Sequence, residues 1–133
     1  MENKRKHLEI IQGVINRLAG NSFYIKGWTI TLLTAVLALS IDRANPDYIF
    51  INLFVIIAFW ILDSFFLSRE RCYRDLYDHV RVLDEKDVDY SMNSDEYRKI
   101  KKNRWISALF SRTLLIFYLS LIIIASSIYC FVK

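Results

Sequence analysis

A single carboxylate, Asp63, interrupts the second of three long apolar stretches in this sequence. A charged side chain within a membrane-spanning segment is costly, so such a residue is either paired or functional. Asp63 lies six residues before Arg69, hence about 9 Å from the charged end of its stretch at 1.5 Å per residue. Lys26 begins the first stretch and Arg112 precedes the third, at comparable depth. The sequence therefore predicts an interfacial charge cluster of Lys26, Asp63 and Arg112 that holds three helices together.

A pore lining is the alternative role for Asp63. In an oligomer, a ring of Asp63 carboxylates would line an ion path, as acidic rings do in cation channels. Asn52, Ile56, Phe59 and Asp63 recur at three- and four-residue steps and therefore share one helix face. This intramembrane polar stripe of Asn52 and Asp63 predicts either a pore lining or, for Asn52, a hydrogen bond to a neighbouring helix.

No pattern of residues indicates an enzyme. His79 follows two tyrosines and two aspartates within residues 73–79, but a charged amphipathic helix accounts for all of them. The sequence has no nucleophile elbow and no glycine-rich phosphate loop. The two cysteines, Cys72 and Cys130, form neither a CxxC nor a Cys/His pattern. We therefore expect no catalytic residue, no bound metal and no cofactor.

Three apolar stretches are long enough to cross a bilayer, whose hydrocarbon core requires about 20 helical residues. Residues 22–41 qualify when Lys26 extends its ammonium to the headgroups. Residues 48–68 carry one charge, Asp63, and residues 113–132 carry none. Soluble helices keep a polar stripe, which the third stretch lacks. We therefore predict an all-α integral membrane protein with three transmembrane helices.

Lysine and arginine are distributed unequally between the two ends of these stretches. Five lie in the segment up to Lys26 and eleven in residues 69–112, whereas Arg43 and Lys133 are alone on the opposite side. The positive-inside rule therefore places the N-terminus and residues 69–112 in the cytoplasm. The C-terminus is expected outside.

The N-terminal segment has helical periodicity of its own. Residues 1–20 predict an amphipathic cytoplasmic helix, which Gly20-Asn21-Ser22 can end before the first span. The chain is thereby divided into this helix, transmembrane helices 1 and 2 in residues 22–68, a cytoplasmic helical hairpin in residues 69–104, and transmembrane helix 3 in residues 105–132.

The hairpin is expected to consist of helical extensions of the second and third spans. No breaker interrupts residues 47–84, so the second span should continue as a stalk, in a helix about 57 Å long. A second helix is expected to start at Asp95 and to run unbroken into the third span, antiparallel to the stalk. One face of the stalk is predicted to bind a partner: Tyr73, Leu76, Tyr77, Val80 and Leu83.

Small side chains follow one face of the first span: Gly27, Thr31, Thr34 and Ala38. Such faces allow helices to approach closely in lipid. The face serves either packing within the chain or self-association. Because three helices bury little on their own, we expect a homo-oligomer.

The formal net charge of +4 would by itself admit nucleic acid as a partner. The basic residues, however, are interleaved with acids and cluster beside the apolar stretches, so they form no continuous phosphate track. Attraction to anionic lipid headgroups accounts for them. The expected partners are the lipid bilayer, further copies of the chain and a cytoplasmic protein or signal.

Two segments, HLEIIQGVINRLAGNSFYIKGW and FWILDSFFLSRERCYRDLYDHVR, resemble a pattern in small, largely uncharacterised bacterial inner-membrane proteins. The most specific elements are Asn21-Ser22-Phe23, Lys26-Gly27-Trp28, and Asp63 with Arg69-Glu70-Arg71. The resemblance covers most of residues 7–81, implies a bacterial inner membrane and transfers no activity. The layout is also similar to membrane effectors of anti-phage systems, although the third span departs from their two-span plan.

Two functions follow as hypotheses. The first is an oligomeric pore-forming or membrane-perturbing effector, gated through its cytoplasmic helices, with anti-phage defence as a candidate role. The alternative is a non-enzymatic membrane-anchored scaffold or subunit that recruits a cytoplasmic protein. Asp63 separates them, because a position on the axis of an oligomer favours conduction, whereas a contact with Lys26 or Arg112 favours a structural role.

Overall fold

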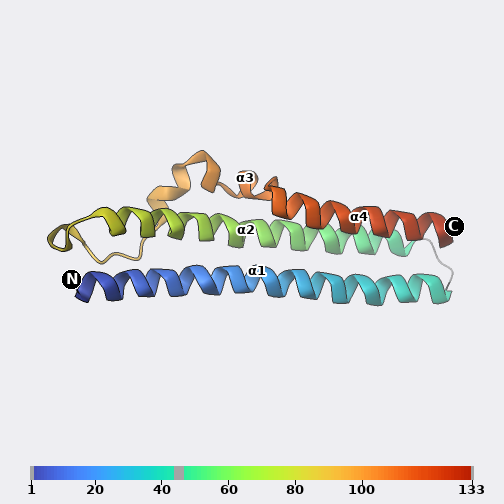
Figure 1. The fold of residues 1–133 in the computed structure, drawn as a ribbon. Coiled ribbons are helices and arrows are strands. Elements are labelled where there is room, and N and C mark those ends of the chain that lie inside the picture. The colour runs from blue at the N-terminus through green and yellow to red at the C-terminus, as the bar shows by residue number, and fades with distance from the viewer. Residues whose placement is uncertain (1, 44–46, 133) are drawn as a thin grey trace.

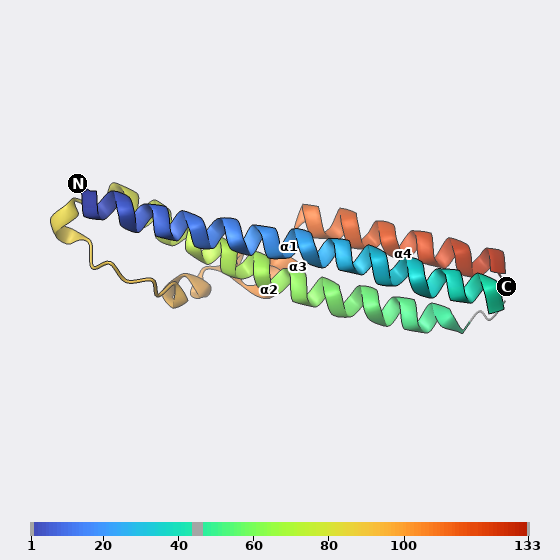
Figure 2. The same ribbon diagram turned by 90° about the horizontal axis from the view of Figure 1, so that it is seen from below.

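The computed structural model describes residues 2–43 and 47–132, and every regular element in them is a helix. Two long helices, α1 (Glu2–Arg43) and α2 (Tyr48–Val82), lie side by side and run in opposite directions (Figure 1 and Figure 2). The chain then passes through three 3₁₀ turns and a short helix: η1 (Glu85–Asp87), η2 (Asp95–Lys99), η3 (Lys101–Asn103) and α3 (Trp105–Leu109). The last helix, α4 (Arg112–Val132), lies alongside the half of the α1–α2 pair far from the N-terminus (Figure 1).

One face of α1 is buried from its first turns almost to its end. The buried side chains on this face are His7, Ile11, Ile15, Ile25, Thr29, Leu33 and Ser40. Their spacing follows the helical repeat, so a single stripe of α1 packs against the rest of the chain. At 1.5 Å per residue the 42 residues of α1 extend about 63 Å, about twice the thickness of a bilayer's hydrocarbon core.

The interior consists of two separate apolar clusters. The first lies between α1, α2 and α4: Leu33, Ile49, Ile56, Leu114, Tyr118, Leu121 and Ala125. The second joins the start of α1 to the end of α2 and the segment after it: Ile11, Ile15, Leu76, Val80 and Val88. We call residues 2–21 and 69–104 the stalk region, and residues 22–43, 47–68 and 105–132 the spanning region.

Among the described residues, three helices are long and apolar enough to cross a membrane by their length and composition: α1, α2 and α4. The spanning region is also apolar on its outside, where Phe54 is 73% exposed and Ile123 is 65% exposed. Apolar surface left in water is unfavourable by about 25 cal/mol per Å². A helix that is apolar on all sides therefore fits a lipid environment.

The predicted end of the first helix at Gly20-Asn21-Ser22 is wrong, because α1 continues through all three residues. Glycine in a helix interior costs about 1 kcal/mol relative to alanine. Packing outweighs this cost, because Ile15 and Ile25 are both buried on the α2-facing side of α1. The side chain of Ser22 is also engaged by α2 rather than by a cap.

The unbroken helix predicted for the second span and stalk is confirmed as α2, but the helix predicted from Asp95 is wrong. A helical turn does start at Asp95, yet the backbone is extended at Ile100 and at Arg104. Asn103 explains the interruption, because its fully buried amide bonds to Asp75 of α2 and to a backbone carbonyl. Asparagine side chains compete with helical hydrogen bonds in this way. The second arm of the predicted antiparallel hairpin is therefore a series of 3₁₀ turns.

Candidate functional site: a buried charge cluster between three helices

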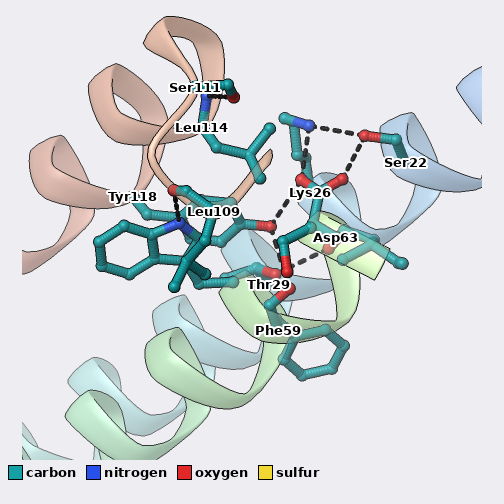
Figure 3. A network of polar contacts seen from close by, with 12 residues as sticks. Ser22, Lys26, Thr29, Phe59, Asp63, Leu109, Ser111, Leu114 and Tyr118 are labelled. Atoms are coloured by element: carbon teal, nitrogen blue, oxygen red, sulfur yellow. Dashed lines mark hydrogen bonds and ion pairs between the residues drawn. The ribbon is translucent and has the colours of Figure 1, made fainter. Parts of the chain in front are cut away.

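Asp63 is fully buried where α1, α2 and α4 meet (Figure 3). The Lys26 ammonium donates to Asp63 Oδ2 over 2.6 Å, and the Tyr118 hydroxyl donates to the same oxygen over 2.9 Å. The Ser22 hydroxyl donates to Asp63 Oδ1. We call these four residues the Asp63 cluster. Both carboxylate oxygens thus accept hydrogen bonds from side chains of other helices.

Lys26 is positioned by its place on α1. It follows Ser22 by one helical turn, so both side chains reach α2 from the same face, and the ammonium also donates to Ser22 Oγ over 2.8 Å. The same ammonium lies 5.8 Å from the centre of the Phe117 ring on α4, within cation–π range. Its side chain is 19% exposed. The positive charge therefore has contacts with both neighbouring helices.

Tyr118 connects α4 to the cluster, and sequence reasoning missed it. Its ring stacks on Trp60 of α2, with centroids 5.8 Å apart and planes 6° from parallel. Trp60 in turn donates its indole N–H to the Leu109 carbonyl over 2.9 Å, at the end of α3. A signal was present, since Tyr118 lies six residues after Arg112 just as Asp63 lies six residues before Arg69. Antiparallel helices place such positions at equal depth.

Arg112 does not belong to the charge cluster, contrary to the prediction. Its side chain is exposed and has no ion-pair partner among the residues that the structure describes. Arg112 opens α4, so six residues and about 9 Å of helix rise separate it from the position level with Asp63. A tyrosine hydroxyl rather than a guanidinium therefore completes the carboxylate's contacts. Lys26 with Asp63 is confirmed, and Arg112 is replaced by Tyr118.

The polar stripe predicted to line a pore faces the interior of the chain. Asn52 is 1% exposed, and Ile56 and Asp63 are fully buried between helices. Neither amide atom of Asn52 has a hydrogen-bond partner within the described residues, so the predicted bond to a neighbouring helix is absent there as well. Within one chain, Asn52 and Asp63 thus face neighbouring helices, and their lining of a pore in an oligomer stays a prediction.

The face of small side chains on the first span lies on the outside. Gly27, Thr31, Thr34 and Ala38 are all exposed. A Cβ atom added at Gly27 would meet nothing within 4 Å. Of the two roles predicted for this face, packing within the chain is thus wrong, and self-association stays a prediction.

The apolar face of the stalk is covered by the chain itself. Leu76 and Val80 are buried against Ile11 and Ile15 of α1 and against Val88. The other predicted members of the face pack on the rim of the same cluster: Tyr73, Tyr77 and Leu83. The prediction that these five residues bind a separate protein is therefore corrected, because the amphipathic N-terminal part of α1 covers the centre of this face.

Polar contacts hold the 3₁₀ segment against α2. Asn103 donates to Asp75 Oδ2 over 2.6 Å, and Lys102 forms an ion pair with the same carboxylate at 3.2 Å. Ser68 donates to the Asn103 carbonyl, and Arg71 donates to the Lys102 carbonyl over 2.6 Å. These bonds satisfy carbonyls that a continuous helix would have satisfied internally.

Both cysteines are free. Cys72 is fully buried in the stalk region, and this burial raises the pKa of its thiol. Cys130 is exposed near the far end of α4. Within residues 2–43 and 47–132, no group of three or more histidine, cysteine or acidic side chains is placed to hold a metal ion.

No family model matches the chain, and neither a curated protein nor a solved structure matches it.

Proposed function

We propose that this chain is a non-enzymatic membrane scaffold, with three spans and a stalk region that projects into the cytoplasm. The pairing of Asp63 inside one chain carries the proposal, because it gives the carboxylate of the spanning region a structural task. A buried carboxylate with a cation and two hydroxyl donors can hold helices in place. The excess of lysine and arginine at the stalk end supports the cytoplasmic orientation.

The stalk region supports the role of a scaffold because it is packed. Both long helices and the segment that follows α2 contribute side chains to its apolar cluster. A partner protein would therefore bind the outer surface of the stalk region, where Ile10 is 57% exposed and Val82 is 72% exposed. Co-purification of a stoichiometric soluble protein that depends on residues 69–104 is the expected observation.

Replacing Asp63 by Asn separates a structural role from a conducting one. The amide keeps the shape of the side chain but removes the charge that attracts Lys26. We expect Asp63→Asn to lower thermal stability in mild detergent and to leave the ion permeability of reconstituted bilayers unchanged. A change in permeability without loss of stability would contradict the scaffold.

Self-association is part of the proposal, through the exposed Gly27 face of α1. Small side chains let two helices approach closely, so van der Waals contact and lipid release favour a dimer. Gly27→Leu is therefore expected to lower the oligomeric mass in mild detergent. Gly13→Leu is the matched control, because a Cβ atom at Gly13 also meets open space but lies in the stalk region.

A pore-forming effector is the second candidate, and Asn52 is the observation that favours it. A buried amide without hydrogen bonds costs about 1–3 kcal/mol. Asn52 lies on the same side of α2 as Asp63, so a rotation of α2 in an oligomer would expose both to a lumen and hydrate the amide. Conductance in reconstituted bilayers that Asn52→Leu abolishes would support the pore. Sealed bilayers at oligomer-forming concentrations of wild-type protein would exclude it.

A further inference from the structure

A groove of about 580 Å³ lies between α1 and α4 at the end of the spanning region nearest the stalk. Two cations, Lys26 and Arg112, lie among its lining residues, and Ile116, Phe117 and Leu121 supply apolar lining along α4. The volume is within the range of about 300–1,000 Å³ that is typical of small-molecule sites. The groove exists because α1 and α4 both pack mainly on α2 and touch each other at few points.

The two cations of the groove differ in whether an acidic side chain of the chain neutralises their charge. Lys26 forms the ion pair with Asp63 at 2.6 Å, so these two charges balance each other. Arg112 is exposed and has no ion-pair partner in the described part of the chain. The groove therefore carries one uncompensated positive charge, which matches the single negative charge of a phosphodiester.

The backbone adds to this preference for an anion. Arg112 and Thr113 form the first turn of α4, a helix of 21 residues, and both line the groove. The positive end of the helix dipole lies at this turn and stabilises a nearby anion. Arg112 also marks the end of the apolar stretch, which in a membrane is the level of the headgroups.

We infer that this groove binds one anionic glycerophospholipid with an uncharged headgroup. The phosphate lies against Arg112 and the first turn of α4, and an acyl chain follows Ile116 and Leu121 along α4. A zwitterionic lipid fits less well, because its headgroup cation would meet the Arg112 guanidinium. The bound lipid joins α1 to α4 where protein contacts are few, and so holds the third span in place. This inference rests on the membrane insertion contained in the proposed function.

The test uses the full-length protein in mild detergent, titrated with phosphatidylglycerol or phosphatidylcholine. Native mass spectrometry counts the lipids retained, and thermal unfolding reports their effect on stability. We expect one phosphatidylglycerol to be retained and to raise the unfolding temperature, with a smaller effect of phosphatidylcholine. Inorganic phosphate should have no effect, because it lacks the acyl chain. Equal effects of the two lipids, or an equal effect of phosphate, would overturn the inference.

Three variants localise the site. Arg112→Gln should weaken phosphatidylglycerol binding about tenfold, the loss expected for one hydrogen bond to a charged group. Ile116→Trp should fill the groove and abolish the preference for phosphatidylglycerol while both cations remain. Arg104→Gln is the control, since Arg104 is an exposed cation near the same end of the spans but outside the groove. Unchanged binding in both groove variants, or an equal loss in the control, would contradict the site.

Failure of the lipid site and failure of the proposed function have different signatures. A protein that inserts but lacks the site appears in the membrane fraction and does not distinguish the two lipids. A protein that does not insert is missing from that fraction, which overturns the scaffold proposal together with this inference.

Discussion

The two halves of the α1–α2 pair, the stalk region and the spanning region, differ in which side chains they bury and which they expose. In the stalk region, an apolar cluster forms much of the interior, and ion pairs such as Arg5–Glu9 and Arg81–Asp78 lie at the surface. In the spanning region, apolar side chains lie on the inside and the outside, and an ion pair, Lys26–Asp63, is held within. The spanning region thus differs from the stalk region in holding a fully buried carboxylate while its outer surface stays apolar.

The proposed membrane insertion accounts for this difference, because it gives the two halves different solvents. Water drives Ile11, Ile15 and Leu76 together, because exposed apolar surface is unfavourable there. Lipid provides no such drive between apolar helices, so packing and hydrogen bonds must specify which helices associate. Asp63, Lys26 and Tyr118 supply that specificity from three different helices.

The largest expected effect comes from breaking the ion pair from one side. Asp63→Leu leaves the Lys26 ammonium without its counter-ion, which costs about 3–5 kcal/mol for a buried pair. Because the Lys26 side chain is 19% exposed, the loss should fall at the lower end of this range. Adding Lys26→Met should recover most of it. Reversible unfolding in detergent measures both, and additive losses in the double variant would show that the pair is not coupled.

Leu76→Ala should break the stalk region and leave the spanning region intact. Leu76 is 5% exposed, and such a truncation costs about 2–5 kcal/mol. Cys72, one turn earlier, reports the opening, because burial and a raised pKa keep its thiol from reacting with maleimide at neutral pH. Labelling of Cys72 should accelerate in Leu76→Ala. In Val82→Ala, where Val82 is 72% exposed, the rate should stay at the wild-type value.

Tyr118→Phe tests the cluster by removing only the hydroxyl, which donates to Asp63 Oδ2 over 2.9 Å and to the Phe59 carbonyl over 3.4 Å. The ring keeps its stacking on Trp60, but the carboxylate loses a donor at 2.9 Å. Hydrogen bonds to charged groups contribute about 1.5–3 kcal/mol, so the free energy of unfolding in detergent should fall by about that amount. Tyr24→Phe, at a side chain 66% exposed, should have no measurable effect. Equal losses in both variants would argue against a special role for the cluster.

The smallest effect has the opposite sign. His7 is 4% exposed, and its Nε2 atom has no hydrogen-bond partner among the described residues. Its ring meets Tyr90 edge-on at 5.4 Å, a contact that phenylalanine can keep. His7→Phe should therefore stabilise the stalk region by about 1 kcal/mol, since an unpaired buried polar atom is removed. A lower unfolding temperature in His7→Phe would indicate a hydrogen bond to water at this position.

Much of the architecture follows from short-range patterns in the sequence. Composition, helical period and depth predict three features: the three apolar stretches, the continuous helix through Asp63 into the stalk, and the Lys26–Asp63 pair. The backbone path of residues 95–104, where a continuous helix was expected, cannot be predicted from such patterns. This path depends on Asn103, whose amide donates a hydrogen bond to Asp75 only after the chain has folded back on α2.

The sequence by itself determined the number of apolar helices and the place of the buried carboxylate, because hydrophobicity and helix rise are local properties. Tertiary structure alone decided that Tyr118 rather than Arg112 completes the Asp63 cluster, and that α1 rather than a separate protein covers the stalk face around Leu76. Both depend on how far one helix is shifted along another. Such shifts are set by the packing of whole faces, which no single stretch of sequence contains.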